Sequence, residues 1–213
     1  MARTRSRDLE AALVDAAEAV LVRDGPAGVT VRAVAAQAGV APMGIYNRFG
    51  GKNGLAEALL IRGFTSLRQA VAPRAETDPL LRLHGAGLRY REFALGHPQH
   101  YAAMFADTLG CGLGSGLLGQ VAAAAFDELV AHVQYVMDSG AAPPADAVDL
   151  AQQIWSTVHG AVSLELAGLI RTPDPTATYE HLLQLVLRGV THPAPSQPDL
   201  PIPPSDPLSS AYR

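Results

Sequence analysis

The spacing of three small or apolar residues, Ala35, Gly39 and Ile45, constrains the fold more than any other feature of the sequence. Counted from Val31, they stand at the fifth, ninth and fifteenth positions. Two short helices that cross steeply need a small side chain at their contact, which Ala35 supplies. The tight turn between them needs a residue that accepts a positive φ, which glycine does. The spacing therefore predicts a helix-turn-helix whose second helix spans residues 42 to 49.

The second helix of this motif is expected to leave one face outward. Pro42 suits its first turn because the missing N–H of proline costs nothing there. Val34, Val40 and Ile45 are expected to fill the small core under the turn. The outward face then carries five residues, Pro42, Met43, Gly44, Asn47 and Arg48.

Apolar residues at helical spacing predict further helices on both sides of the motif. A first helix from about Leu9 is expected to end at Asp24-Gly25-Pro26, and a fourth to span about residues 52 to 71. Further stretches with this period are residues 80 to 94, 101 to 105, 118 to 137, 145 to 170 and 179 to 190. We expect an all-α protein of about nine helices, in which a three-helix helix-turn-helix head precedes a larger helical bundle.

Three parts of the chain are expected from these patterns. Residues 1 to 63 form the head, and residues 64 to 191 form a helical domain for ligand binding and dimerisation. Residues 192 to 213 contain seven prolines in 22 positions without an apolar period, which predicts a disordered or extended tail.

Charge and cysteine content narrow the class of protein. The net charge of −4 is unevenly divided, because residues 1 to 62 carry eight basic and six acidic residues while the remainder carries eight and fourteen. A basic head on an acidic body fits a nucleic-acid contact confined to the head. The single cysteine, Cys111, allows no internal disulfide. With no signal peptide and no apolar run of about 18 residues, a cytoplasmic protein without membrane contact is expected.

The segment GVTVRAVAAQAGVAPMGIYNRFGGKNGL, residues 28 to 55, resembles the DNA-binding head of the TetR-type transcriptional regulators. The resemblance covers about residues 8 to 63. It is carried by a Gly-Val pair, a Tyr and a Phe three apart, and a Lys and a Leu opening the fourth helix, namely Gly39-Val40, Tyr46, Phe49, Lys52 and Leu55.

The resemblance implies contacts with the phosphates of double-stranded DNA. Tyr46 would offer its hydroxyl, and Lys52 would add a full charge beside the positive end of a helix. Thr30, at the start of the motif's first helix, would cap that helix and contact a phosphate across the groove. Such contacts fix the register of the protein on DNA but read no sequence.

Base reading would fall to the remaining residues of the outward face. Asn47 can pair bidentately with adenine, and Met43 can touch a thymine methyl beside the bare backbone of Gly44. Arg48 is assigned to either a phosphate or a base. Phe49 is expected to pack inward.

The larger half resembles the Trp-His-Gly variety of TetR-type ligand domain over roughly residues 80 to 190. The stretches IWSTVHGAVSLEL and YREFALGHPQHYAAMF carry this resemblance. It implies a pocket for a small apolar effector, for which we expect six bulky lining residues, Tyr101, Met104, Phe105, Phe126, Trp155 and His159. It also implies a homodimer through helices near residues 146 to 171 and 176 to 190, which would place two heads on a palindromic operator.

Catalysis is not expected. The histidines and the cysteine show no metal-ligand spacing and no nucleophile–base pairing, so no enzyme activity, cofactor or metal is predicted. Two roles are open for His159, that of a hydrogen-bonded core histidine and that of a ligand contact. Two functions stay open, a ligand-responsive DNA-binding repressor and a helical small-molecule-binding or oligomer-forming protein whose head does not bind DNA. Tyr46 and Lys52 favour the first.

Overall fold

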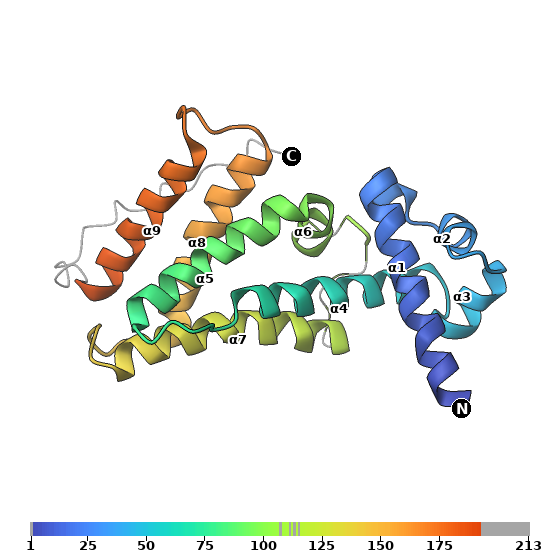
Figure 1. Ribbon diagram of the computed structural model, residues 1–213, viewed down its shortest axis with the longest axis horizontal. Coiled ribbons are helices and arrows are strands. Elements are labelled where there is room, and N and C mark those ends of the chain that lie inside the picture. The colour runs from blue at the N-terminus through green and yellow to red at the C-terminus, as the bar shows by residue number, and fades with distance from the viewer. Residues whose placement is uncertain (1, 107, 111, 113, 115, 193–213) are drawn as a thin grey trace, which may run out of the picture.

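The computed structural model describes residues 2–106, 108–110, 112, 114 and 116–192, with side chains from residue 9 onward. Cys111 lies outside the described residues, as does the expected tail apart from its first residue, His192. Within the described part the chain is all-helical (Figure 1). The nine helices are α1 (Ala2–Gly28), α2 (Val31–Gln37), α3 (Pro42–Phe49), α4 (Lys52–Val71), α5 (Pro79–Gly96), α6 (Pro98–Phe105), α7 (Leu117–Asp138), α8 (Ala147–Leu166) and α9 (Pro175–Thr191). The predicted all-α class and helix number are confirmed.

Helices α1 to α3 form the head, at one end of the elongated molecule (Figure 1). The predicted end of the first helix is marked by Gly25, which has φ 70° and is followed by Pro26, and a short helical turn then continues to Gly28. Leu13, Leu21 and Ile45 are fully buried in the head core. Apolar packing of α1 on the helix-turn-helix therefore holds the motif in place.

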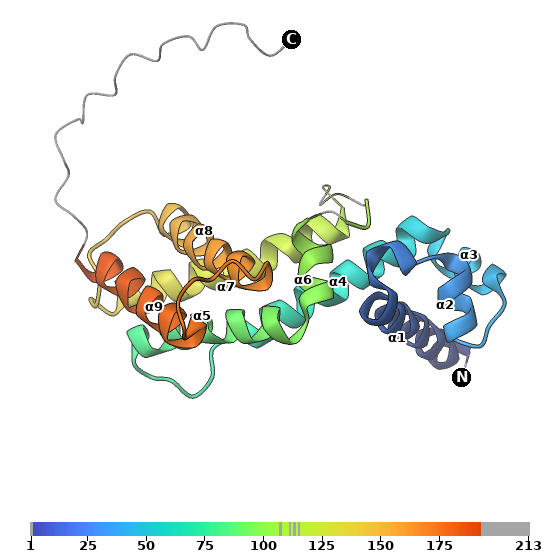
Figure 2. The same ribbon diagram turned by 90° about the horizontal axis from the view of Figure 1, so that it is seen from above.

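Helix α4 is one continuous helix that connects the head to the rest of the protein (Figures 1 and 2). It begins beside α3 and then runs along α7 and under α5. The boundary expected at residue 63 thus falls inside a continuous helix. Any rotation of α4 at its far end must move its first residue, Lys52, as well.

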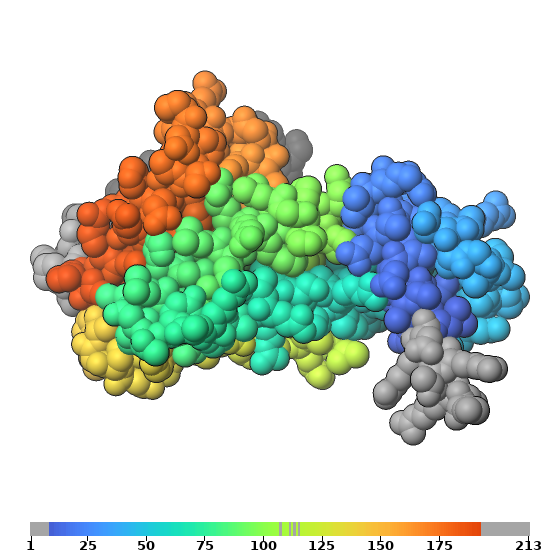
Figure 3. All heavy atoms as spheres, viewed as in Figure 1, coloured from blue at the N-terminus to red at the C-terminus, as the bar shows by residue number. Residues whose placement is uncertain are grey.

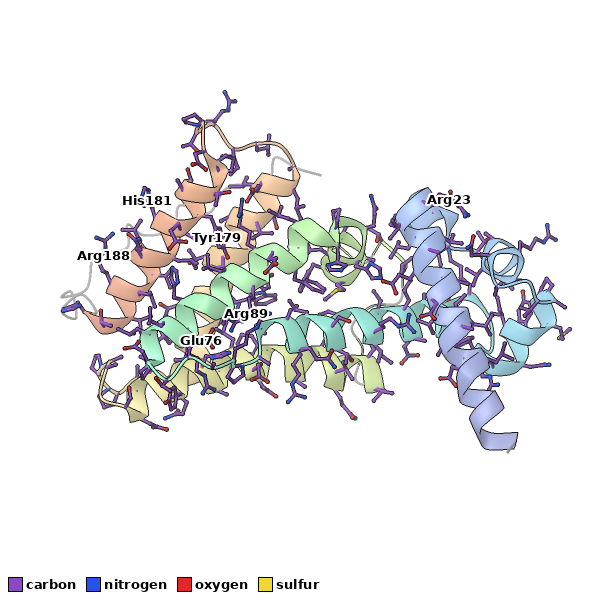
Figure 4. The ribbon with its side chains drawn as sticks, viewed as in Figure 1. Arg23, Glu76, Arg89, Tyr179, His181 and Arg188 are labelled. Carbon is purple, nitrogen blue, oxygen red and sulfur yellow. The ribbon has the colours of Figure 1, made fainter. Side chains whose placement is uncertain are left out.

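Side-chain hydrogen bonds and ion pairs help to hold helices α5 to α9 around α4. Arg89 is almost fully buried, donates to the carbonyls of Ala70 and Ala72, and pairs with Glu76 at 2.8 Å, which fixes the loop between α4 and α5 (Figure 4). Tyr179 of α9 donates to the Gly87 carbonyl of α5 at 2.9 Å. The described helices include none with the length and apolarity needed to cross a bilayer.

Candidate nucleic-acid interface and effector cavity

The turn of the helix-turn-helix has the geometry that its sequence predicts. Gly39 has φ 66°, a left-handed conformation that L side chains rarely adopt. Ala35 is buried at the contact between α2 and α3. At the start of α2, the Thr30 hydroxyl accepts a hydrogen bond from the Ala33 N–H at 3.2 Å, which is an N-cap. Thr30 itself remains exposed.

The outer face of α3 is open to solvent. Met43 is 63% exposed and Tyr46 is 52% exposed, values unusual for large apolar or aromatic groups. Pro42 and Asn47 are also exposed, whereas Gly44 is half-buried. Exposed apolar and amide groups on one short helix form a surface that can contact base edges.

Tyr46 and Lys52 lie together at the start of α4. A Cβ on Gly51, the residue before Lys52, would be 3.5 Å from the Tyr46 ring, so the ring lies against the backbone that opens α4. Gly51 provides no side-chain cap, and Lys52 is exposed. The Tyr46 ring therefore adjoins the N-terminus of α4, the positive end of the helix dipole, where Lys52 is the first residue, and this combination suits a phosphate.

Arg48 differs from the other residues of this face. Its guanidinium is half-buried and lies 3.9 Å from the Glu10 carboxylate of α1. An arginine engaged with an acidic residue of its own chain is less available to DNA. Phe49 is half-buried and packs against the head core, as expected.

The larger half contains a cavity of about 310 Å³ lined by residues of helices α4 to α9. Its wall is almost entirely apolar. Three of the six expected residues, Phe105, Phe126 and Trp155, line it. The volume lies at the lower end of the range of about 300–1,000 Å³ found for small-molecule sites.

The other three expected residues lie outside the cavity lining. Met104 packs on α4, where a Cβ on Gly63 would be 2.8 Å from its sulfur. Tyr101 and His159 belong to a hydrogen-bonded network just behind the wall. None of the three faces the space of the cavity.

Tyr90, which the sequence did not single out, joins this network to the cavity. The Trp155 indole N–H donates to its hydroxyl at 3.2 Å, and that hydroxyl is 2.9 Å from the Tyr101 oxygen. Both hydroxyls also lie within hydrogen-bonding distance of His159 Nδ1, that of Tyr101 at 2.6 Å and that of Tyr90 at 2.9 Å. Burial lowers the pKa of His159, which agrees with a neutral ring that accepts. Burial also raises the pKa of Tyr90 far above its ordinary value, so its hydroxyl stays uncharged.

Two histidines on the wall were also not expected there. His132 is buried; its Nε2–H donates to the Val71 carbonyl at 2.9 Å, and its Nδ1 accepts from Arg82 at 3.1 Å. His84 pairs with Glu180 at 3.0 Å. The polar groups of the wall are thus engaged within the protein, a property that spacing in sequence cannot reveal. Within the described residues, no three His, Cys, Asp or Glu side chains are arranged to hold a metal ion.

Both halves of the chain match known families. Residues 13–59 match the bacterial regulatory proteins of the tetR family, and residues 83–186 match the tetracyclin repressor-like C-terminal domain. An uncharacterised HTH-type transcriptional regulator of Mycobacterium tuberculosis is 29% identical over 182 residues, which cover 84% of this chain and 79% of that protein.

Solved structures share the whole fold. A protein of unknown function from Rhodococcus sp. RHA1 has a TM-score of 0.76 at 26% identity, covering 86% of this chain and 95% of that one. The fatty acid degradation regulator FadR from Bacillus halodurans has a TM-score of 0.68 at 18% identity, covering 86% and 96%. The fold and head are those of a helix-turn-helix transcriptional regulator. With both of its domains matched, the chain belongs to the TetR family.

Proposed function

We propose that this TetR-family regulator is a repressor, released from a palindromic operator by a small apolar molecule that enters the cavity. The observation that carries this proposal is the course of α4. Its first residue, Lys52, lies at the face that would meet DNA, and its last turns supply Phe64, Leu67 and Val71 to the cavity wall. A ligand that displaces these side chains therefore acts on the same rigid helix whose first residue, Lys52, is proposed to bind a DNA phosphate.

The contacts with DNA follow from exposure and position. We assign phosphate contacts to Tyr46 and Lys52 at the start of α4 and to Thr30 at the start of α2. Met43 and Asn47 read bases, with Gly44 allowing close approach of the backbone. For Arg48 we propose a phosphate contact that forms only when its guanidinium leaves the Glu10 carboxylate, since the carboxylate and the phosphate compete for the same guanidinium.

The chemistry of the cavity limits the effector to uncharged molecules. Its polar groups, Tyr90, Trp155, His84 and His132, already have partners within the protein. A carboxylate placed there would lose its hydration without gaining a free donor, which is costly in an apolar site. The Trp155–Tyr90 bond at 3.2 Å is the longest in its network and can be exchanged for one ligand oxygen.

Dimerisation of TetR regulators would bring two heads onto one operator. Leu164 of α8 and Leu185 of α9 are 49% and 61% exposed, and a Cβ at Gly160 or Gly189 would meet nothing within 4 Å. Exposed leucines beside small residues on two adjacent helices suit a four-helix interface with a second copy. We keep the Trp-His-Gly assignment of this domain, and the cytoplasm as its location, as parts of the same proposal.

The test uses a matched pair of probes. An operator is first obtained by binding-site selection from random duplexes, and its affinity is then measured by fluorescence anisotropy with 1-decanol or decanoate present. We expect the alcohol to weaken operator binding and the decanoate anion to have no effect at neutral pH. Release by decanoate alone would refute the uncharged-effector assignment. Failure of the selection would instead favour the alternative, a helical ligand-binding protein that does not bind DNA.

A further inference from the structure

A second, smaller cavity lies where the head meets the bundle. Its volume is about 50 Å³, and its lining includes Glu18 of α1, Arg62 of α4, His97 and His100. In Figure 3 the atoms of α1 lie directly against those of the α6 region, so among the described residues the head contacts the bundle through α6 as well as through α4. The cavity is therefore part of the joint between the two halves.

His100 of α6 is the unusual residue in this joint. It is only 5% exposed, and neither of its ring nitrogens has a hydrogen-bond partner. A neutral imidazole always carries one N–H, so a buried donor is left unsatisfied, at a cost of about 1–3 kcal/mol. Among the described residues no other buried side-chain nitrogen or oxygen lacks a hydrogen-bond partner, so this group calls for an explanation.

Glu18 of α1 is an acceptor close to His100. Its Oε1 lies 3.6 Å from His100 Nε2, just beyond hydrogen-bonding distance, while its Oε2 accepts from Arg62 at 3.1 Å. Arg62 has a further partner on α1 in Asp15, so α4 remains tied to the head even when Glu18 is shared. The Glu18 carboxylate thus faces both Arg62 of α4 and His100 of α6.

The charged and titratable groups facing His100 come from each neighbouring element. Glu18 on α1 favours the protonated ring, whereas Arg62 on α4 and His97 before α6 oppose it. His97 itself is tethered by the hydrogen bond from its Nδ1–H to the Phe93 carbonyl at 3.0 Å, which keeps it close to α5. Phe93 adds only apolar surface to the cavity.

We propose that His100, Glu18 and Arg62 form a proton-sensitive junction between head and bundle, in which acidification closes the His100–Glu18 gap into a hydrogen-bonded ion pair and draws α6 toward α1. The 50 Å³ of free space beside the ring allows this movement. The proposal rests on the proposed repressor function only for its consequence, a change in the placement of the head at the operator.

The direction of the pH effect follows from burial. In the gapped arrangement burial lowers the pKa of His100 below its ordinary value, so this arrangement is favoured by the neutral ring. Since the ion pair with Glu18 gives the closed arrangement the higher His100 pKa, the gapped arrangement is favoured at high pH and loses ground to the closed one as pH falls.

The experiment follows the histidine ring signals and the backbone amide signals of α1 and α2 by NMR in the full-length dimer, from pH 8 to pH 5. No DNA is present, so the result is independent of operator binding. The His100 signal is assigned as the one missing from His100→Gln. We expect the amides of α1 to shift with the midpoint of His100, and this response to vanish in His100→Gln.

Three further variants keep the test decisive if His100→Gln does not fold. Glu18→Gln removes the carboxylate facing His100, and it should lower the His100 midpoint and abolish the head response. Asp15→Asn removes the other carboxylate bound to Arg62, and it should leave the His100 midpoint and the head response unchanged. The same is expected of His192→Gln, at the exposed end of α9. Equal effects of Glu18→Gln and Asp15→Asn, or a head response that survives His100→Gln, would overturn the proposal.

Discussion

Filling the large cavity should stabilise the ligand-free protein. Ala125 of α7 lines the cavity, and Ala125→Leu adds three carbon atoms to its wall. Burial is worth about 0.8 kcal/mol per carbon, so the free energy of unfolding can rise by at most about 2.4 kcal/mol. For a chain of this size, each kcal/mol raises the melting temperature by about 2–4 °C. The upper limit is therefore about 5–10 °C by calorimetry at fixed dimer concentration.

The matched control for this change is Ala131→Leu on the same helix. Ala131 is exposed and does not line the cavity, so its substitution should change stability by no more than about 0.5 kcal/mol. Ala125→Leu should also raise the concentration of 1-decanol needed to weaken operator binding. If Ala125→Leu instead lowers the melting temperature below that of both the parent and the control, the space is not there in solution, and the assignment of the cavity fails.

Four other substitutions test the surfaces of the protein. Lys52→Ala and Tyr46→Phe should each weaken binding to all duplexes alike, by about 1–2 kcal/mol; loss of binding to the operator alone would contradict a phosphate role. Asn47→Ala should relax discrimination at one position of each half-site by about 1–3 kcal/mol, so an unchanged selected sequence would exclude base reading. Leu185→Glu should give monomers in sedimentation, whereas Leu81→Glu, equally exposed but on α5, should leave the dimer intact; a dimeric Leu185→Glu protein would place the interface elsewhere.

Local geometry was predictable from the sequence where one residue type is required. Gly39 has the positive φ that the turn demands, and Ile45 fills the core beneath it. The break at Gly25 also follows from the sequence, because a proline comes directly after it. In each case the requirement acts over a few residues, so spacing alone reveals it.

The candidate effector site was less predictable, because it depends on how six helices pack. Bulk and apolarity placed Tyr101 and His159 at the pocket, yet their hydrogen bonds to each other hold them behind its wall. Tyr90 lines the cavity because the pitch of α5 turns it toward Trp155, a partner 65 positions away in sequence. Gly160, the glycine of the Trp-His-Gly stretch, does not line the cavity, and a Cβ there would meet nothing within 4 Å.

The sequence also does not predict what the outer face of α9 contacts. His181 and Arg188 lie on the outside of α9 in Figure 4, and both are exposed. The apolar period of the sequence shows that one face of α9 is buried, but it does not show whether the exposed Leu185 meets water or a second chain. That distinction depends on the assembly.

The central claim, that the head binds DNA through a phosphate spot at the start of α4, is tested most directly by salt dependence. The affinity of the parent and of Lys52→Ala for the selected operator is measured by anisotropy between 50 and 200 mM salt. We predict a steep linear fall of log affinity with log salt for the parent, and a slope shallower by about two units for Lys52→Ala, since one phosphate contact is lost from each of the two half-sites. Equal slopes for the two proteins, or a flat response of the parent, would contradict it.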